Sequence, residues 1–264
     1  IQNREELETT PESGVALECL LEGIRAADPA VVVRERIGLQ GSTLRVDPMD
    51  GDAATYDLDD YEEVVVLGGG KAAGHVTAAL EDVLSDLIAG GIVVTDDPRP
   101  TSRVAIHEGD HPVPSEANVE GSREILARAE AASEGTLILA PITGGGSALM
   151  TAPAPGIDLA DLQTVTDGML RSGLDITRMN AVRKHLSAMK GGGLAAAAPP
   201  ATVVGLLFSD VIGDDPGVIA SGPTAPDDTT FADAEAALEE GDVSPPDAIA
   251  RRIERGIAGE VPET

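Results

Sequence analysis

The sequence predicts an α/β fold, a Rossmann-like three-layer α/β/α arrangement with a mostly parallel sheet. Short apolar runs of strand length alternate along the chain with amphipathic segments of helical period, which is the pattern of βαβ crossovers covered on both faces. Two of these runs end in a turn of three glycines, as strands do where they lead into helices beside a ligand. The 264 residues suffice for one large domain or two small ones.

The apolar pattern predicts the elements in order. A surface helix is expected over 15–27, because its apolar residues have helical spacing and Pro29 follows. Short alternating stretches at 43–46 and 54–58 predict edge strands. Buried strands are then expected at 64–67, 92–94, 103–106, 136–139 and 202–207, and helices at 76–87, 114–132, 158–170, 175–190, 231–238 and 248–257.

The charge balance excludes several classes of partner. The chain has 18 basic and 46 acidic residues, a net charge of −28, which repels phosphate backbones and anionic lipid headgroups. We therefore expect no nucleic-acid partner and no membrane association. The uncharged run 191–209 contains a Pro-Pro pair and a glycine run that would break a helix in lipid. The single cysteine, Cys19, favours a reducing, cytoplasmic location.

Lysine is scarce in this acidic chain and occurs only at Lys71, Lys184 and Lys190. The imbalance predicts a halophilic protein, whose acidic surface stays hydrated in concentrated salt. A lysine that is retained under such a bias is expected to have a specific role. Lys71 and Lys190 each adjoin a run of three glycines.

The first glycine turn, Gly68–Gly74, follows a predicted strand and contains Gly69, Gly70 and Lys71. Glycines let a backbone approach an anion closely, the following helix directs N–H groups at it, and Lys71 adds an ammonium group. A glycine here can also merely permit close packing. The turn fits G-x-G-x-x-A with Asp96 further on, which leaves a dinucleotide-dependent dehydrogenase open.

The second glycine turn, Pro141–Ser147, repeats this geometry with a hydroxyl in place of the amine. Its predicted anion-binding residues are Gly144, Gly145, Gly146 and Ser147. Two such turns predict a phosphate or carboxylate site.

Two further segments contain candidate site residues. Successive helical residues are 100° apart, so Asn180, Arg183 and Lys184 share one face of the predicted 175–190 helix, and this basic stripe favours an anion. Lys190 is explained by the end of that helix, where a cation complements the dipole. Asp210 follows another predicted strand, where a carboxylate could hold Mg²⁺ through waters and substrate phosphates.

Five motifs, in this order, resemble the N-terminal domain of the MOFRL-type glycerate 2-kinases. They begin at Gly68, Gly109, Thr143, Asn180 and Ser209 and read GGGKAA, GDHPVP, TGGGSA, NAVRKHLS and SDVIGD. The resemblance covers nearly the whole chain. It implies transfer of the ATP γ-phosphoryl group to the 2-hydroxyl of D-glycerate, with ATP and Mg²⁺ as cofactors and Lys71 as the catalytic lysine.

The resemblance also implies a domain organisation. Residues 1–264 would form the N-terminal glycerate kinase domain, with a small edge-strand excursion at 38–60. The family's C-terminal domain, which supplies a second catalytic arginine, is expected to be absent from this chain. Assembly as a homodimer stays open, as do two other functions: an NAD(P)-dependent hydroxypyruvate reductase and a non-catalytic anion-binding domain.

Overall fold

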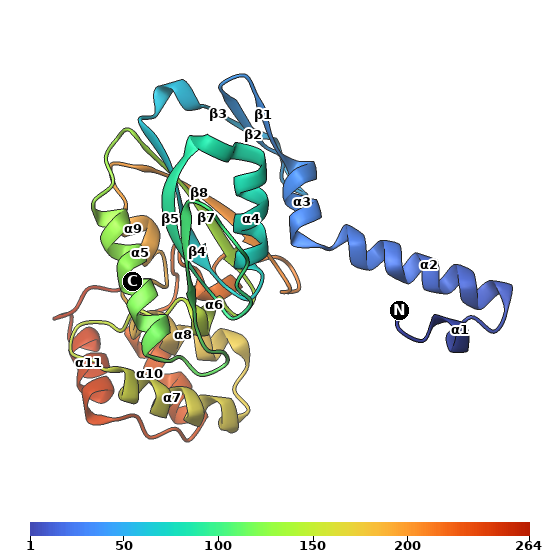
Figure 1. The fold of residues 1–264 in the computed structure, drawn as a ribbon. Helices are drawn as coiled ribbons and strands as arrows, with labels where there is room; N and C mark the ends of the chain where they lie inside the picture. The colour runs from blue at the N-terminus through green and yellow to red at the C-terminus, as the bar shows by residue number, and fades with distance from the viewer.

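A five-stranded parallel sheet forms the centre of the computed structural model, which describes residues 1–264 (Figure 1). Its strands lie in the order β6-β5-β4-β7-β8, and every neighbouring pair is parallel. The chain thus moves outward from β4 to β6 on one side and then returns to build β7 and β8 on the other. This is the strand order of a Rossmann-like sheet, as the sequence predicts. The strands are β4 Glu63–Gly69, β5 Ile88–Thr95, β6 Val104–Glu108, β7 Thr136–Thr143 and β8 Thr202–Phe208.

Helices cover both faces of this sheet (Figure 1). Val64 and Val66 of β4 point into a core shared with α4, whereas Val65 and Leu67 point into a second core shared with α5 and α9. Alternate residues of a strand face opposite sides, so a fully apolar strand needs cover on both. The longer helices are α2 Pro11–Ala26, α3 Pro29–Arg36, α4 Ala73–Leu84, α5 Glu116–Glu130, α7 Leu159–Ser172, α8 Ile176–His185, α10 Phe231–Glu240 and α11 Asp247–Ile257; α1 Arg4–Leu7, α6 Gly146–Leu149 and α9 Gly193–Ala197 are short.

Four helices, α7, α8, α10 and α11, gather beyond the end of the sheet where α6 lies (Figure 1). They share a third apolar core, in which the ring of Phe231 is fully buried. The ring lies edge-on to His185 with centroids 4.5 Å apart. We call these four helices the helical lobe.

The N-terminal part differs from the sequence prediction in two respects. The predicted edge strands do not join the main sheet; with β1 Ile37–Gln40 they form a separate antiparallel sheet, β2 being Thr43–Val46 and β3 Ala54–Asp57. Pro29 begins a helix as well as following one, because Asp28 caps α3 by accepting from the N–H groups of Ala30 and Val31 and proline is favoured at the first helical position.

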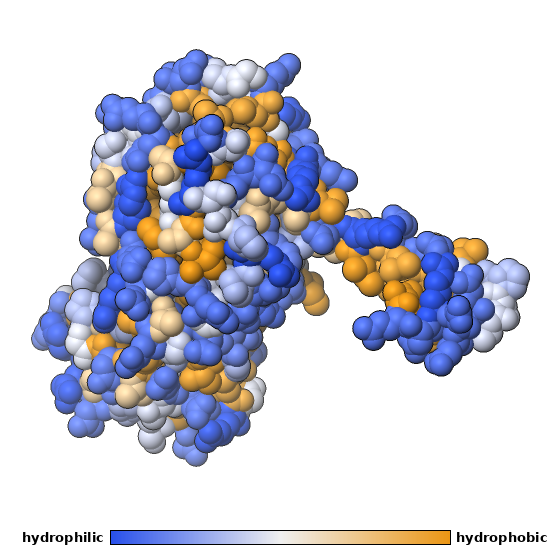
Figure 2. All heavy atoms as spheres, in the orientation of Figure 1, coloured by the Kyte–Doolittle hydropathy of each residue, from blue (hydrophilic) through white to orange (hydrophobic).

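The predicted surface helix is α2, and it extends away from the rest of the molecule as an arm (Figure 1). Apolar side chains lie along it, and Val15, Leu20 and Ile24 are 57% to 65% exposed (Figure 2). None of the helices combines the length and apolar character that crossing a bilayer requires.

The predicted 175–190 helix is too long. α8 ends at His185, because the Ser187 hydroxyl accepts from the N–H groups of Met189 and Lys190, which a continued helix would need for its own carbonyls. The prediction that Lys190 lies at a helix end is therefore wrong. Lys190 is buried, and its Nζ donates to the carbonyl of Met150 at 2.7 Å.

Candidate functional site

The two glycine turns meet at the carboxyl ends of β4 and β7. These neighbouring strands flank the point at which the strand order reverses, where open α/β sheets bind ligands. The N–H of Lys71 donates to the carbonyl of Gly144 at 2.9 Å, and the N–H of Ala72 donates to the hydroxyl of Thr143 at 3.1 Å. These two hydrogen bonds thus join the first turn to the second.

Close packing explains the glycines of the first turn. A Cβ on Gly68 would overlap the carbonyl of Pro141, and one on Gly70, whose φ is +129°, would overlap Thr143. Gly69 lies against Met150, whose Cγ would be 2.7 Å from an added Cβ. All three glycines are buried, and their lack of a side chain lets the two turns pack closely together.

The second turn, rather than the first, offers free backbone donors. At the first turn the N–H groups of Gly70, Lys71 and Ala72 all donate within the protein. The expected cradle of N–H groups is therefore absent there. The N–H groups of Gly144 and Gly145 donate to no protein acceptor, and both residues are partly exposed. Consecutive free N–H groups of this kind form anion-binding concavities.

Lys71 lies over this second turn. A Cβ on Gly145, whose φ is +81°, would lie 2.8 Å from Cγ of Lys71 and 3.2 Å from Cδ2 of His111. The Lys71 side chain is exposed, and its ammonium forms no ion pair or hydrogen bond. The side chains of Lys71 and His111 therefore both lie against Gly145 of the second turn.

Asp210 reaches the same turn from the end of β8. Its Oδ2 would lie 2.7 Å from a Cβ on Gly144, and the residue is exposed. No group of three or more histidine, cysteine or carboxylate side chains is arranged to hold a metal ion. A single carboxylate nevertheless matches the way Mg²⁺ is usually held, by one or two carboxylates together with substrate phosphates.

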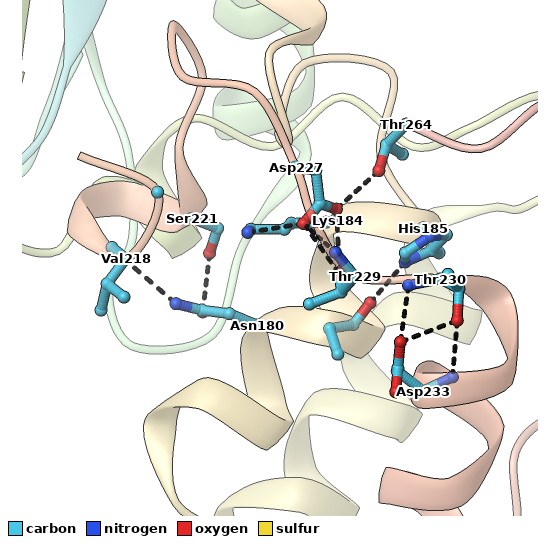
Figure 3. A network of polar contacts seen from close by, with 12 residues as sticks. Asn180, Lys184, His185, Val218, Ser221, Asp227, Thr229, Thr230, Asp233 and Thr264 are labelled. Atoms are coloured by element: carbon cyan, nitrogen blue, oxygen red, sulfur yellow. Dashed lines mark hydrogen bonds and ion pairs between the residues drawn. The ribbon is translucent and has the colours of Figure 1, made fainter. Parts of the chain in front are cut away.

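A chain of side-chain hydrogen bonds connects the second turn to α8. The hydroxyls of Ser147 and Ser221 are 2.8 Å apart, and Ser221 donates to Oδ1 of Asn180 at 2.9 Å. Asn180 in turn donates to the carbonyl of Val218 at 3.2 Å (Figure 3). Ser221 is fully buried and has a left-handed backbone, φ +64°. The sequence pattern missed Ser221, although the Gly-Pro that follows it is a turn signal.

Arg183 and Lys184 follow Asn180 on α8 but meet different surroundings. Arg183 is half-buried, and its one hydrogen bond is a long contact, 3.4 Å, to Oδ1 of Asn180; burial lowers the pKa of its guanidinium. Lys184 is buried and donates to Asp227 at 2.9 Å (Figure 3). The ammonium of Lys184 is thus already neutralised by a carboxylate, whereas Arg183 has none.

Several known proteins are similar to this chain in sequence, and some of them in fold. A Pyrococcus horikoshii protein named "Glycerate 2-kinase" is 37% identical over 254 residues, which cover 95% of this chain and 56% of the relative. An Agrobacterium vitis protein named "Putative hydroxypyruvate reductase" is 48% identical over 172 residues, or 64% of this chain and 45% of the relative. The chain spans about half the length of these curated relatives.

A crystal structure of a protein from Pyrococcus horikoshii has the same fold. It matches with a TM-score of 0.85 at 36% identity, over 97% of this chain and 57% of that one. The family model described as "Domain of unknown function (DUF4147)" matches residues 15–254. The chain therefore belongs to the DUF4147 family.

Proposed function

We propose that this chain forms part of a glycerate 2-kinase, which transfers the γ-phosphoryl group of ATP to the 2-hydroxyl of D-glycerate. One observation carries the proposal: an unpaired lysine, Lys71, lies against Gly145 of a turn in which the N–H groups of Gly144 and Gly145 donate to no protein acceptor. Phosphoryl transfer needs mainly positioning and neutralisation of the oxygens of the transferred group. The name of the Pyrococcus horikoshii relative supports this choice.

In this proposal the second turn and Lys71 hold the transferred phosphoryl group. The N–H groups of Gly144 and Gly145 donate to its oxygens, and Lys71 adds positive charge as negative charge moves in the transition state. The 2-hydroxyl oxygen forms a bond to the γ-phosphorus while the bond from phosphorus to the β–γ bridging oxygen breaks. The hydroxyl proton passes to solvent, and ADP and 2-phosphoglycerate leave.

Asp210 is the residue that would hold Mg²⁺ at this site. A Mg²⁺ ion held there would supply positive charge that neutralises the leaving group. The carboxylate of Asp210 accepts no hydrogen bond and forms no ion pair, so its oxygens are available for that role.

Coupled assays distinguish this function from the two alternatives. We expect the full-length gene product to release ADP from ATP only when D-glycerate is present, and to leave NADH and NADPH unoxidised with hydroxypyruvate. Nicotinamide oxidation without ADP release would instead indicate a reductase. Nucleotide or glycerate binding without either reaction would indicate a binding domain.

The remaining parts of the proposal concern the whole protein. This chain covers about half the length of the relatives, and we propose that a domain matching the rest of their length closes the site and supplies a second catalytic arginine. On its own the chain would then bind its substrates weakly and turn them over poorly. A cytoplasmic location is the expected setting, and assembly as a homodimer stays open.

We also propose that the acidic surface is adapted to concentrated salt. A net charge of −28 repels itself most at low ionic strength, where the Debye length is about 30 Å at 0.01 M. The melting temperature should therefore rise between 0.01 and 0.3 M KCl. A nonionic osmolyte at equal osmolality is the control, because it does not screen charge. A melting temperature that is unchanged by KCl would contradict this adaptation.

A further inference from the structure

A small cavity lies between the second glycine turn, α7 and the segment that follows α8. Its volume is about 30 Å³, room for roughly two water-sized groups. Val165 and Met169 of α7 form part of an apolar wall, and the hydroxyls of Ser147, Thr151 and Ser187 lie in the remainder. The cavity therefore suits a small polar group with an apolar neighbour.

Only two charged side chains line this cavity, Arg183 and Lys190, and both are basic. Lys190 is 4% exposed, and the Met150 carbonyl is the single acceptor of its Nζ. Neither cation contacts a carboxylate. Burial, together with the nearby charge of Arg183, lowers the pKa of Lys190 to about 7.

The other buried lysine, Lys184, shows that a lysine with a structural role is paired with a carboxylate in this protein. Lys184 is paired with the carboxylate of Asp227 at 2.9 Å, and most surface arginines are likewise paired. Acidic residues are abundant, 46 in this chain, yet none is paired with Lys190. A buried Lys190 and a half-buried Arg183 that face one cavity without a counter-charge are costly, and an anionic ligand would remove that cost.

We propose that Arg183 and Lys190 bind the carboxylate of the acceptor substrate, a small 2-hydroxy acid, in this cavity. The inference rests on the proposed kinase function and assigns the acceptor half of the same site. The carboxylate oxygens accept from Nζ of Lys190 and from the Arg183 guanidinium. Ser147 belongs both to the cavity wall and to the second turn, so an acid held here extends its hydroxyl toward Lys71.

Two observations favour a carboxylate over a phosphate of the nucleotide. The cavity has room for two oxygens, whereas a phosphoryl group presents three. The exposed Lys71 and the free N–H groups of Gly144 and Gly145 already offer a more open place for phosphates.

The protonation state of Lys190 gives the site a pH dependence. Arg183 is the one other charged or titratable group in the cavity wall, and it stays charged throughout the neutral range. An anion favours protonated Lys190, so binding takes up a proton near pH 7 and the affinity falls as the pH rises through the pKa. We expect an affinity about tenfold or more lower at pH 9 than at pH 6.

Calorimetric titration of the full-length gene product tests the site without requiring catalysis. At pH 6 and without nucleotide, D-glycerate and lactate should bind, whereas glycerol, which lacks the carboxylate, should not. Lys190→Met should weaken glycerate binding about tenfold to a hundredfold, the loss expected for a charge-assisted hydrogen bond, and should abolish the pH dependence. Its melting temperature should be unchanged or higher, because a buried charge is removed.

Lys184→Met is the matched control for stability, since it leaves Asp227 unpaired and should lower the melting temperature. If Lys190→Met lowers stability and leaves glycerate affinity unchanged, the lysine is structural and the proposal is wrong. If it weakens binding of inorganic phosphate or of a nonhydrolysable ATP analogue but not of glycerate, the cavity is a phosphate site and the proposal is also wrong.

Proton uptake by the unmodified chain tests the same site if Lys190→Met fails to fold. Titrations at pH 7 in two buffers of different ionisation enthalpy should show uptake of a fraction of a proton per glycerate bound, and no uptake would contradict the proposal. The gene product could bind glycerate only when Lys190 is present and yet show no kinase activity. That result would support this binding site and contradict only the proposed function.

Discussion

Turnover of the full-length gene product with ATP and D-glycerate should fall about a hundredfold or more when Lys71 is replaced by alanine. Removing one preorganised charge donor costs about 3 kcal/mol of transition-state stabilisation, and no ion pair or hydrogen bond within the protein occupies the Lys71 ammonium. Because the side chain is exposed, the melting temperature should stay within a few degrees of the unmodified protein. The measurement is kcat from ADP release.

Arg45→Ala is the matched control for the loss of one positive charge. Arg45 lies on β2 of the small sheet, and its exposed side chain pairs only with Asp47 at the surface. It should leave turnover unchanged. Near-normal turnover in Lys71→Ala would remove the central residue of the proposed mechanism.

Replacing Asp227 with asparagine should lower the free energy of unfolding by roughly 3–5 kcal/mol, because it leaves the Lys184 ammonium buried without a counter-charge. The Asp227 side chain is fully buried and accepts hydrogen bonds from Lys184, Thr229 and Thr264. Chemical denaturation measures the loss. Adding Lys184→Met to the asparagine variant should recover much of it, since the unpaired charge is then gone.

The same carboxylate gives the stability a dependence on acid. Burial alone would raise the pKa of Asp227, but the bonds from Lys184, Thr264 and Thr229 together hold it below its ordinary value of 3.8. A group with a lowered folded-state pKa stabilises the protein above its unfolded-state pKa, and the stabilisation is lost as the pH falls through the folded value. The difference in stability between the unmodified protein and Asp227→Asn should therefore shrink below pH 4 and be constant above pH 6.

The sequence predicts the main sheet well because its strands are apolar on both faces. β1 was missed because only Ile37 of its four residues is buried, which leaves no alternation to detect. Lys71 and the second turn could be located because they follow strands directly. Whether Lys71 is catalytic, and whether the other predicted residues bind ligands, stays a prediction.

The parts of the site that depend on distant contacts could not be predicted. Ser147 and Ser221 are 74 positions apart, and no local pattern relates them. Lys190 continues the helical period of 175–190, so the sequence places it on the helix. It is buried because the helix ends earlier, where the Ser187 hydroxyl accepts from the N–H groups of Met189 and Lys190. The distinction between the two glycine turns likewise depends on which backbone donors are already used.

The α2 arm has a consequence for how the isolated chain opens. Gly14 is its single buried residue, and Figure 1 shows it extending away from both sheets. Opening such a helix exposes almost no apolar surface that is not already in water, so its backbone amides are protected by little more than the helix–coil equilibrium of a 16-residue segment. In hydrogen–deuterium exchange these amides should therefore acquire deuterium long before those of β4 and β7, and in a transition separate from global unfolding.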